Sequence, residues 1–455
     1  MSQKDLVDSL GFYLNQVEGA VSIFTKSLDE IFQPGFHSVL LTNYMFDLSW
    51  LFQRIPLLLT AERLLIVHGD EQEYQPFSPC HFITFHKPRL PFRYGTHHTK
   101  LIILFYRTTV RFVLTTANMI QSDWENKTQG LFLKDFPQTG ELKPCPFLET
   151  MDDYLSALGK PLDYYRSLLC KYDFSNAGVV LIPSVPGYHG GQSLDKYGHR
   201  SLHSNISRYC SISDEQRRRH QRRKNTHSSF RLLLQCSSIG SISEKWLTQE
   251  FFHSIVSSCW KQDDWHSCFE WDLMWPSVQQ VRNSIQGYAS GAAFPWAKKN
   301  YRSFQTSHLC LWNAHFFKRD AWLPHMKSYM AYQENGNIFW FLLTSANLST
   351  AAWGSLVHNQ SQLFIRSYEL GVLWTPMLCS YAHPVNNTVI QLTTPQHITS
   401  YYPQETNSNT LFCLPLPFQL PPQHYDSNDL PWLWDVTYQS PDRFGNTWPL
   451  EWNVE

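Results

Sequence analysis

An internal repeat constrains the fold of this chain more than any other feature of its sequence. Two stretches about 230 residues apart each contain the motif H-x-K, followed by an apolar run that ends in Ala-Asn. The repeated residues are His98, Lys100 and Asn118 in the first stretch and His325, Lys327 and Asn347 in the second. Aligned on the asparagines, FVLTTANMIQSDW and FLLTSANLSTAAW share six identities in register. The sequence therefore predicts two similar structural units.

Each unit is predicted to be a pair of strands. Because side chains alternate along a strand, the histidine and lysine of each motif should project from one face, with His97 on the other face and structural. The second strands are the apolar runs Val110–Ala117 and Ile338–Ala346. Asn335-Gly336 is a strong hairpin signal, whereas the first unit must turn at Arg107–Thr109. Histidine, lysine and amide groups at strand ends suit an anion such as a phosphate.

A single H-x-K on an apolar strand usually has no catalytic role. Two copies in the same context reverse that expectation. The asparagine follows the lysine by 18 residues in the first copy and by 20 in the second. The repeat therefore favours a functional site.

The motifs resemble those of the phospholipase D superfamily and, more narrowly, of the tyrosyl-DNA phosphodiesterases. Most of the superfamily carries an aspartate five residues after the lysine, where this chain has Phe105 and Tyr332. The phrases GTHHTK, TSANLS, AAWG and RSYELGVL match the narrower family. The resemblance runs from about Phe24 to Trp448. It implies an α/β fold of two similar phospholipase D-like domains, each a mixed β-sheet flanked by helices, related by a pseudo-twofold and sharing one active site.

On this basis we expect three parts along the chain. Residues 1–23 should be an N-terminal leader helix, residues 24–176 the N-terminal domain, and residues 177–455 the C-terminal domain. We expect a basic insertion at 187–229, whose run SDEQRRRHQRRKN is interpreted as a nuclear localisation patch, a phosphate-binding surface or a solvated loop. The predicted location is the nucleus, with the cytoplasm as the alternative.

The resemblance also implies roles for the repeated residues. His98 attacks phosphorus to form a phosphohistidine, and His325 protonates the leaving tyrosine oxygen and then activates water. The lysines and asparagines hold the non-bridging oxygens. Glu369 and Gln129 orient the imidazoles, the glutamate stabilising a cationic histidine and the glutamine leaving its partner easier to deprotonate. No metal or other cofactor is expected.

The substrate implied is a DNA 3′ end, single-stranded, nicked or blunt, joined through phosphate to a tyrosine of stalled topoisomerase I. Tyr94 should stack on a base. Ser238, Gly240 and Ser241, in the segment SSIGS, should approach the DNA backbone. Ser349 should cap a helix and also touch DNA. A nuclease or other phosphodiesterase of the wider superfamily and a non-catalytic DNA-binding relative are the rival interpretations.

Composition limits the partners of the protein. The chain has 455 residues, 43% of them hydrophobic, which indicates a globular protein. Its net charge is -1, so any electrostatic attraction to DNA must come from a local group of basic residues. Its ten cysteines form no C-x-x-C pair and are expected to be free thiols. No signal peptide or membrane span is expected, and the protein is predicted to be a monomer.

Overall fold

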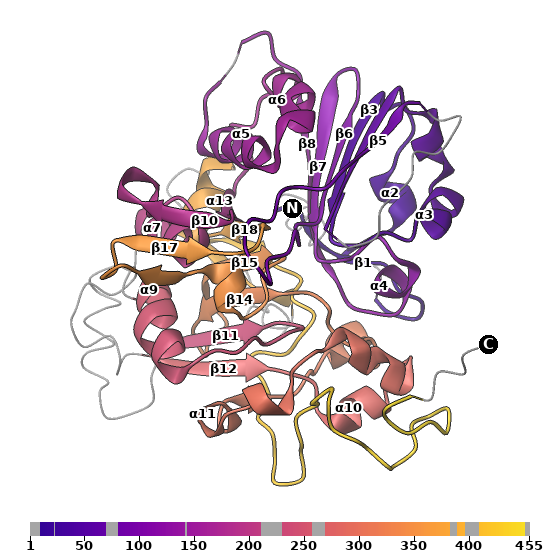
Figure 1. The fold of residues 1–455 in the computed structure, drawn as a ribbon, viewed down its shortest axis with the longest axis vertical. Coiled ribbons are helices and arrows are strands. Elements are labelled where there is room, and N and C mark those ends of the chain that lie inside the picture. Colours follow the sequence, from indigo (N-terminus) through magenta and orange to yellow (C-terminus); the bar gives the residue numbers. More distant parts are fainter. Residues whose placement is uncertain are drawn as a thin grey trace.

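Two mixed β-sheets form the centre of the protein, as the computed structural model shows in Figure 1. The structure describes residues 10–21, 23–69, 81–141, 143–210, 230–256, 269–382, 389–395 and 409–450. The first sheet belongs to the N-terminal half and the second to the C-terminal half. Within the described residues, the strands of the first sheet all precede residue 138 and those of the second all follow residue 179.

The first sheet has eight strands in the order β2-β1-β8-β7-β6-β3-β4-β5. Their bounds in that order are Thr25–Lys26, Phe12–Asn15, Gly130–Pro137, Thr109–Thr115, Leu101–Phe105, Ser38–Asn43, Arg63–His68 and Ile83–His86. The helices of this half are α2 (Leu28–Ile31), α3 (Leu48–Arg54), α4 (Gln121–Glu125), α5 (Pro146–Leu158) and α6 (Asp163–Leu169), with 3-10 turns at Pro56–Thr60 and Lys160–Leu162.

The second sheet follows the order β13-β12-β11-β14-β15-β18-β9, with β19 beside β15 and β20 beside β19. The bounds are Leu309–Cys310, Glu270–Met274, Arg231–Gln235, Ser328–Tyr332, Ile338–Thr344, Glu369–Trp374, Val180–Ser184, Val389–Thr393 and Asn409–Cys413. A separate small sheet contains β10 (Gly187–Gly190), β17 (Gln362–Ile365) and β16 (Ser355–Val357). The helices are α7 (Gly198–Tyr209), α9 (Phe252–Val256), α10 (Val278–Arg282), α11 (Ser303–Thr306), α12 (Thr350–Trp353) and α13 (Pro376–Ala382).

The two sheets share one topology, which confirms the predicted pair of similar domains. The series β8-β7-β6-β3-β4-β5 corresponds strand by strand to β18-β15-β14-β11-β12-β13. In both, three parallel strands adjoin three antiparallel ones. An antiparallel strand, β1 or β9, then follows on the outer side. The repeat therefore extends far beyond the motif that reveals it in sequence.

Aromatic packing joins the halves. Phe12 of β1 lies 5.2 Å from Phe341 and 5.7 Å from Trp374, measured between ring centroids, and Phe132 lies 5.6 Å from Trp374. Such edge-to-face contacts add to the stabilisation from burial of the rings. Gly130 is needed here, because a Cβ at this position would lie 2.5 Å from a methyl group of Leu343.

Two expectations about domain organisation are wrong. Residues 12–15 do not belong to a leader helix, because they form β1 and pair with β2 and β8. Residues 187–210 do not belong to an insertion, because they form β10, which pairs with β17, and α7. The basic run itself lies outside the described residues. The helical stretch that starts with α5 is interrupted at Gly159, whose φ of 122° is accessible mainly to glycine.

The C-terminal segment lies along the second half, near α10 and α11 in Figure 1. Trp432 is fully buried, its Nε1 donates to the carbonyl of Gly291, and Trp448 packs on its ring at 5.1 Å. Cysteines 145, 170, 210, 236, 310, 379 and 413 are free thiols, as expected. No helix of the described residues combines the length and apolar character needed to cross a bilayer.

Candidate active site

The repeated polar residues gather at one end of each sheet. His98 and Lys100 directly precede β6 rather than lying within it, and Asn118 comes three residues after the end of β7. Gln129 directly precedes β8. Because β6 and β8 are each antiparallel to β7, the starts of β6 and β8 lie at the end of β7. The second half repeats this arrangement with β14, β15 and β18.

The two halves exchange backbone hydrogen bonds at this end of the sheets. The N–H of His98 donates to the carbonyl of Tyr368 at 2.9 Å, and the N–H of His325 donates to that of Thr128 at 3.0 Å. Tyr368 precedes Glu369, and Thr128 precedes Gln129. Each histidine is therefore held beside the orienting residue of the opposite half, and the pseudo-twofold runs through the site.

His98 is oriented for nucleophilic attack. Its Nδ1 lies 2.8 Å from the carbonyl oxygen of Ser345 and 3.1 Å from Oε2 of Glu369. Both oxygens are acceptors, so Nδ1 carries the proton and Nε2 of the neutral ring has a free lone pair. Burial lowers the pKa of His98 and the Lys100 cation lowers it further, while Glu369 acts in the opposite direction. The ring is thus kept neutral.

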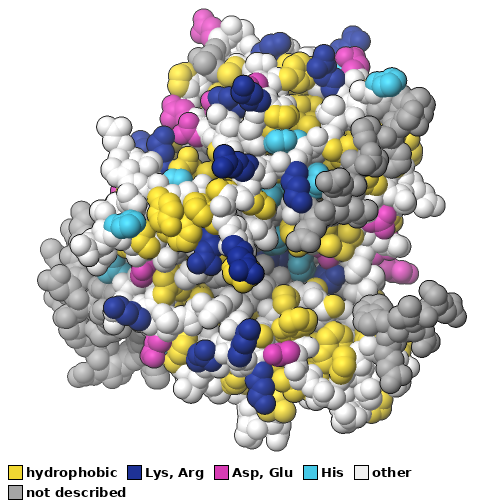
Figure 2. Space-filling model, in the orientation of Figure 1, with side chains coloured by type: hydrophobic (Ala, Val, Ile, Leu, Met, Phe, Trp, Pro, Cys, Tyr) yellow, Lys and Arg dark blue, Asp and Glu magenta, His cyan; other side chains and the backbone are white. Residues whose placement is uncertain are grey.

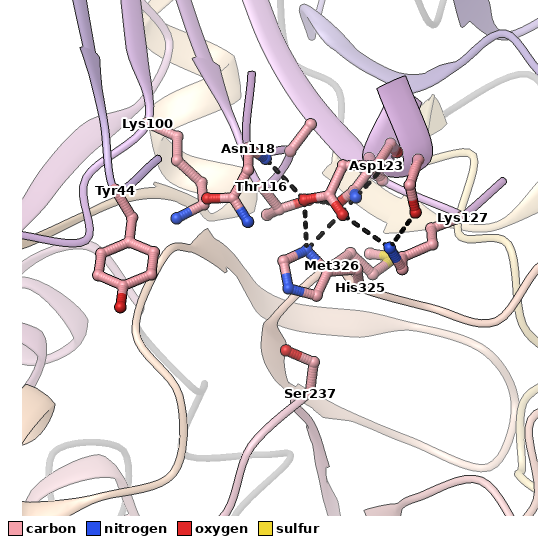
Figure 3. A network of polar contacts seen from close by, with 12 residues as sticks. Tyr44, Lys100, Thr116, Asn118, Asp123, Lys127, Ser237, His325 and Met326 are labelled. Carbon is pink, nitrogen blue, oxygen red and sulfur yellow. Dashed lines mark hydrogen bonds and ion pairs between the residues drawn. The ribbon is translucent and has the colours of Figure 1, made fainter. Parts of the chain in front are cut away.

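His325 has two neighbours, of which sequence reasoning found one. Its Nδ1 lies 3.4 Å from Nε2 of Gln129 and 3.3 Å from Oδ2 of Asp123 (Figure 3). The amide nitrogen of Gln129 can only donate, whereas the carboxylate of Asp123 can only accept, so the two contacts make opposite demands on Nδ1. We assign the proton to Nδ1, facing Asp123, which leaves Nε2 for the substrate. In Figure 3 that second nitrogen points away from Asp123. Burial lowers the pKa of His325 strongly, and the Lys327 cation adds to this, although Asp123 opposes both.

Asp123 belongs to a buried charge network. Its carboxylate accepts from Nζ of Lys127 at 2.9 Å and from the backbone N–H of Asn118 at 2.8 Å. Burial acts to raise its pKa, but the contact with His325, the Lys127 cation and the Asn118 N–H outweigh this effect and hold the pKa below the usual range. Asp123 is therefore an anion in contact with His325.

The two lysines make a cationic centre between the halves. Each Nζ donates to the carbonyl of the histidine two residues before it. Burial lowers the pKa of Lys100 to about 8, and the pKa of Lys327 is lowered by burial and by the neighbouring Lys100. Lys327 also acts on the pKa of His98 and Lys100 on that of His325, so both sets face one site. Two buried cations favour an anionic ligand.

The asparagines differ in how they are held. Oδ1 of Asn347 accepts from the backbone N–H groups of Ser237 at 3.1 Å and Ser238 at 3.0 Å, which leaves Nδ2 as the group of this amide that can donate to a ligand. Asn118 is buried, and its Oδ1 has no hydrogen-bond partner among the described residues. A buried amide group with an unmet partner is suited to a polar ligand.

The residues expected to bind DNA lie in two places. Ser238, Gly240 and Ser349 come together, since Ile239 pairs with Leu348 and a Cβ at Gly240 would lie 2.8 Å from that of Ser349. Ser241 follows and is exposed. Ser349 caps α12 by accepting from the N–H of Ala352, as expected.

Tyr94 lies on the segment that leads to His98. Its φ of 64° is left-handed, and 72% of its surface is exposed. His97, expected to be structural, is fully buried against Tyr368.

Several site residues gave no signal in the repeat. Asp123 aligns with Ala352, and Tyr44, whose ring lies 5.7 Å from that of His98, comes from a distant segment. Thr116 and Ser345 do align, and their hydroxyls donate to Oε1 of Gln129 and Oε2 of Glu369, respectively. A hydroxyl residue therefore stands two positions before the asparagine in both copies of the repeat, and this feature of the sequence could have linked Gln129 and Glu369 to the motifs.

One group of described side chains could hold a metal ion, away from the histidines. The ligand atoms of Asp272, Cys310 and His424 lie within 4.8 Å of one another. They are distant in sequence, so spacing along the chain gives no sign of this group. Both carboxylate oxygens of Asp272 already accept from Arg231, at 2.9 and 3.0 Å. Its charge is thereby balanced, and the group takes no part in the chemistry proposed below.

Comparison with known proteins agrees with this geometry. The family model for tyrosyl-DNA phosphodiesterase matches residues 12–426. The chain belongs to the tyrosyl-DNA phosphodiesterase family.

Relatives and solved structures extend this result. The chain is 37% identical to tyrosyl-DNA phosphodiesterase 1 of Arabidopsis thaliana, over 93% of this chain and 73% of that protein. It is 31% identical to a probable tyrosyl-DNA phosphodiesterase of Caenorhabditis elegans, over 79% and 72% of the two chains. The crystal structure of the yeast tyrosyl-DNA phosphodiesterase shares the fold with a TM-score of 0.69 at 18% identity, covering 93% of this chain and 98% of that one.

Proposed function

We propose that this protein hydrolyses the phosphodiester bond between a DNA 3′-phosphate and a tyrosine, and so repairs DNA ends left by stalled topoisomerase I. The observation that carries the proposal is the crossing of the two His-Lys-Asn sets, in which each histidine is oriented by a residue of the other half. Family membership supplies the substrate class.

In the first step, Nε2 of His98 attacks phosphorus as the bond to the tyrosyl oxygen breaks. The proton for that oxygen comes from Nε2 of His325. In the free enzyme His325 is neutral, because burial and the nearby lysines lower its pKa. A bound phosphodiester offsets the lysine charges, so its arrival raises the pKa of His325, and Asp123 acts in the same direction. Substrate binding thus prepares the acid.

In the second step, water attacks the phosphohistidine. His325, now neutral, takes a proton from the water, and the bond between phosphorus and His98 breaks to give a 3′-phosphate. While the adduct exists, the ring of His98 is cationic, and the Glu369 carboxylate at 3.1 Å stabilises that charge. The negative charge that grows on the phosphoryl oxygens faces Lys100, Lys327 and the asparagine amides.

Two features favour this activity over the rival interpretations, a phospholipase and a non-catalytic relative. The positions where most of the wider superfamily has aspartate hold Phe105 and Tyr332, which are fully buried in β6 and β14. Both His-Lys-Asn sets are present, which disfavours a non-catalytic relative.

The test is an assay of the full chain with a 3′-phosphotyrosyl oligonucleotide and, separately, with phosphatidylcholine vesicles. We expect free tyrosine and a DNA 3′-phosphate from the first substrate and no product from the second. Cleavage of the lipid alone would replace the proposal with a phospholipase activity, and cleavage of neither would leave a binding protein.

We also propose that the protein acts as a monomer and is located in the nucleus. One chain supplies both halves of the site, so a monomer suffices, and light scattering should give the mass of a single chain. The nucleus is supported by the basic run between residues 217 and 224, and deletion of residues 214–225 should abolish nuclear import of a fused reporter while leaving turnover within a few-fold.

A further inference from the structure

A cluster of aromatic rings covers the small sheet beside the active site. Tyr188 of β10 stacks on Phe364 of β17, with ring centroids 4.4 Å apart and planes 18° apart. Phe92 meets both rings edge-on, at 5.6 and 4.9 Å. The tip of the β16–β17 hairpin, left-handed at three successive residues, brings the ring of His358 to 6.1 Å from Tyr188. In Figure 2 a hydrophobic patch lies over β10 and β17, with Lys and Arg side chains beside it.

Two arginines make this cluster electropositive. The guanidinium of Arg366 lies 5.4 Å from the centroid of Phe364, and that of Arg93 lies 5.1 Å from the centroid of Tyr94. Among the residues that the structure describes, no carboxylate pairs with either arginine. Tyr188 is 53% exposed, so the face of the cluster is open to a ligand. Stacked rings beside unpaired guanidinium groups attract flat rings and phosphates.

The cluster is continuous with the catalytic centre. Phe92 and Tyr94 lie on one turn, closed by the N–H of Gly95 donating to the carbonyl of Phe92. That segment then runs beside the one from Phe364 to Glu369. Gly95 packs so tightly on the carbonyl of Arg366 that a Cβ would lie 2.3 Å from it, and the N–H of Thr96 donates to Ser367. One end of this paired strip holds the aromatic cluster and the other holds His98 and Glu369.

We propose that Tyr188, Phe364, Phe92 and Arg366 form a stacking platform for single-stranded DNA on the 5′ side of the scissile phosphate. The inference rests on the proposed function, because Tyr94, the predicted base-stacking residue, marks this side as the DNA side. Base stacking on aromatic rings tolerates any sequence, as an enzyme for unspecified DNA ends requires. The arginines of the platform also attract the DNA phosphates locally, whereas the net charge of the whole chain, -1, does not attract them.

The length of the strip sets the length of DNA that can reach the platform. Phe364 precedes Glu369 by five residues, which span at most about 17 Å when fully extended. Stacked nucleotides rise about 3.4 Å each, so the strip corresponds to no more than about five nucleotides. Shorter substrates should not reach Tyr188, and longer ones should.

The test compares variants of the full chain on 3′-phosphotyrosyl substrates with about two and about twelve nucleotides of DNA. Tyr188→Ala should raise KM about five- to tenfold for the long substrate, with kcat unchanged, and leave the short substrate unaffected. Tyr188→Phe should restore the long-substrate KM. Tyr381→Ala is the matched control, since Tyr381 is 57% exposed on α13, and it should change neither. Arg366→Ala should reduce the salt dependence of binding by about one phosphate contact.

An equal effect on both substrates, or no effect on the long one, would overturn the platform. An effect of Tyr188→Ala that grows with peptide length and not with DNA length would assign the surface to the protein part of the adduct and equally reject the proposal. Binding of unmodified single-stranded DNA, measured by fluorescence anisotropy, needs no catalysis. It therefore tests the platform even if the wild-type protein cleaves neither substrate, in which case the proposed function alone fails.

Discussion

The two histidines occupy equivalent places in the two halves, but their surroundings differ. His98 contacts a carboxylate, Glu369, and a backbone carbonyl. His325 contacts an amide, Gln129, and a second carboxylate, Asp123, which is itself paired with Lys127. The first half supplies Asp123 from a position where the second half has Ala352.

This difference shows which features the scaffold imposes and which are local. The crossed backbone hydrogen bonds, the lysine contacts and the hydroxyl contacts of Thr116 and Ser345 are the same in both halves. The orienting groups are not. We infer that the pseudo-twofold sets the positions of the imidazoles, while the side chains around each ring set its protonation and hence its role.

We expect the largest effect when the imidazole ring of either histidine is removed. His98→Ala should lower turnover by at least roughly 10³-fold and leave no covalent adduct, because the variant lacks the imidazole that attacks phosphorus. His325→Ala should slow both steps, yet DNA joined to His98 should persist, since the base for water is missing. The measurement is a denaturing gel with labelled DNA carrying a good leaving group. Label on the His98 variant instead would reverse the two roles, and label on neither would indicate direct attack by water.

Asp123→Asn removes the carboxylate that distinguishes His325. We expect kcat on a tyrosyl substrate to fall about 10- to 100-fold, because a smaller fraction of His325 is then protonated, and to fall less with a nitrophenyl leaving group. Asp123 acts to raise the pKa of His325, so the variant should lose first-step activity at a lower pH than the wild type. Asp135→Asn, at an ion pair with Arg111 remote from the site, is the control. Equal losses on both leaving groups would reject the role of Asp123 in acid catalysis.

Exchanging the orienting residues tests whether they set the roles. Glu369→Gln should slow adduct formation about tenfold, since the cationic phosphohistidine loses its stabilising carboxylate, and should lower the pKa of His98. Gln129→Glu should raise the pKa of His325 by adding a second carboxylate. Single-turnover rates against pH measure both shifts. If neither profile moves, Glu369 and Gln129 act only as structural supports.

From the lowered pKa of Lys100 we predict a smaller effect, on the pH dependence of the wild-type protein. Burial lowers the pKa of Lys100 to about 8, and the charged form is the one present below that pH. The value of kcat/KM should therefore decline by a few-fold as pH rises through about 8, as Lys100 loses its charge. Bound phosphate favours charged lysine, so kcat should decline at a higher pH. Parallel declines in both parameters would contradict this assignment.

Removal of divalent ions by a chelator should change the role of neither histidine. Two lysine cations already face the phosphate position, so we expect full activity on the tyrosyl oligonucleotide in excess EDTA. The Cys310→Ser variant, which alters the group with Asp272 and His424, should be equally active. Loss of activity in EDTA that a divalent ion restores would reject the metal-free mechanism.

The sequence predicted much of this site because the repeat is local. H-x-K, the apolar strand and Ala-Asn lie within about 25 residues of one another, and strand alternation relates them directly. Glu369 was found because an acid in an apolar strand needs a partner, and His98 is that partner. Asp123 was missed because its counterpart in the repeat is Ala352, and its importance comes from a histidine 202 residues away.

By itself, the sequence determined the two-unit α/β fold, the six repeated residues and the family. These follow from periodicity and from motifs, because both depend on residues that lie close together in the sequence. Only the tertiary structure decided that Glu369 belongs to His98 and Gln129 to His325, that residues 12–15 complete the first sheet, and that Asp123 joins the site. The physical reason is that each of these contacts joins segments distant in sequence. Such contacts exist only after the sheets have packed and buried their strands.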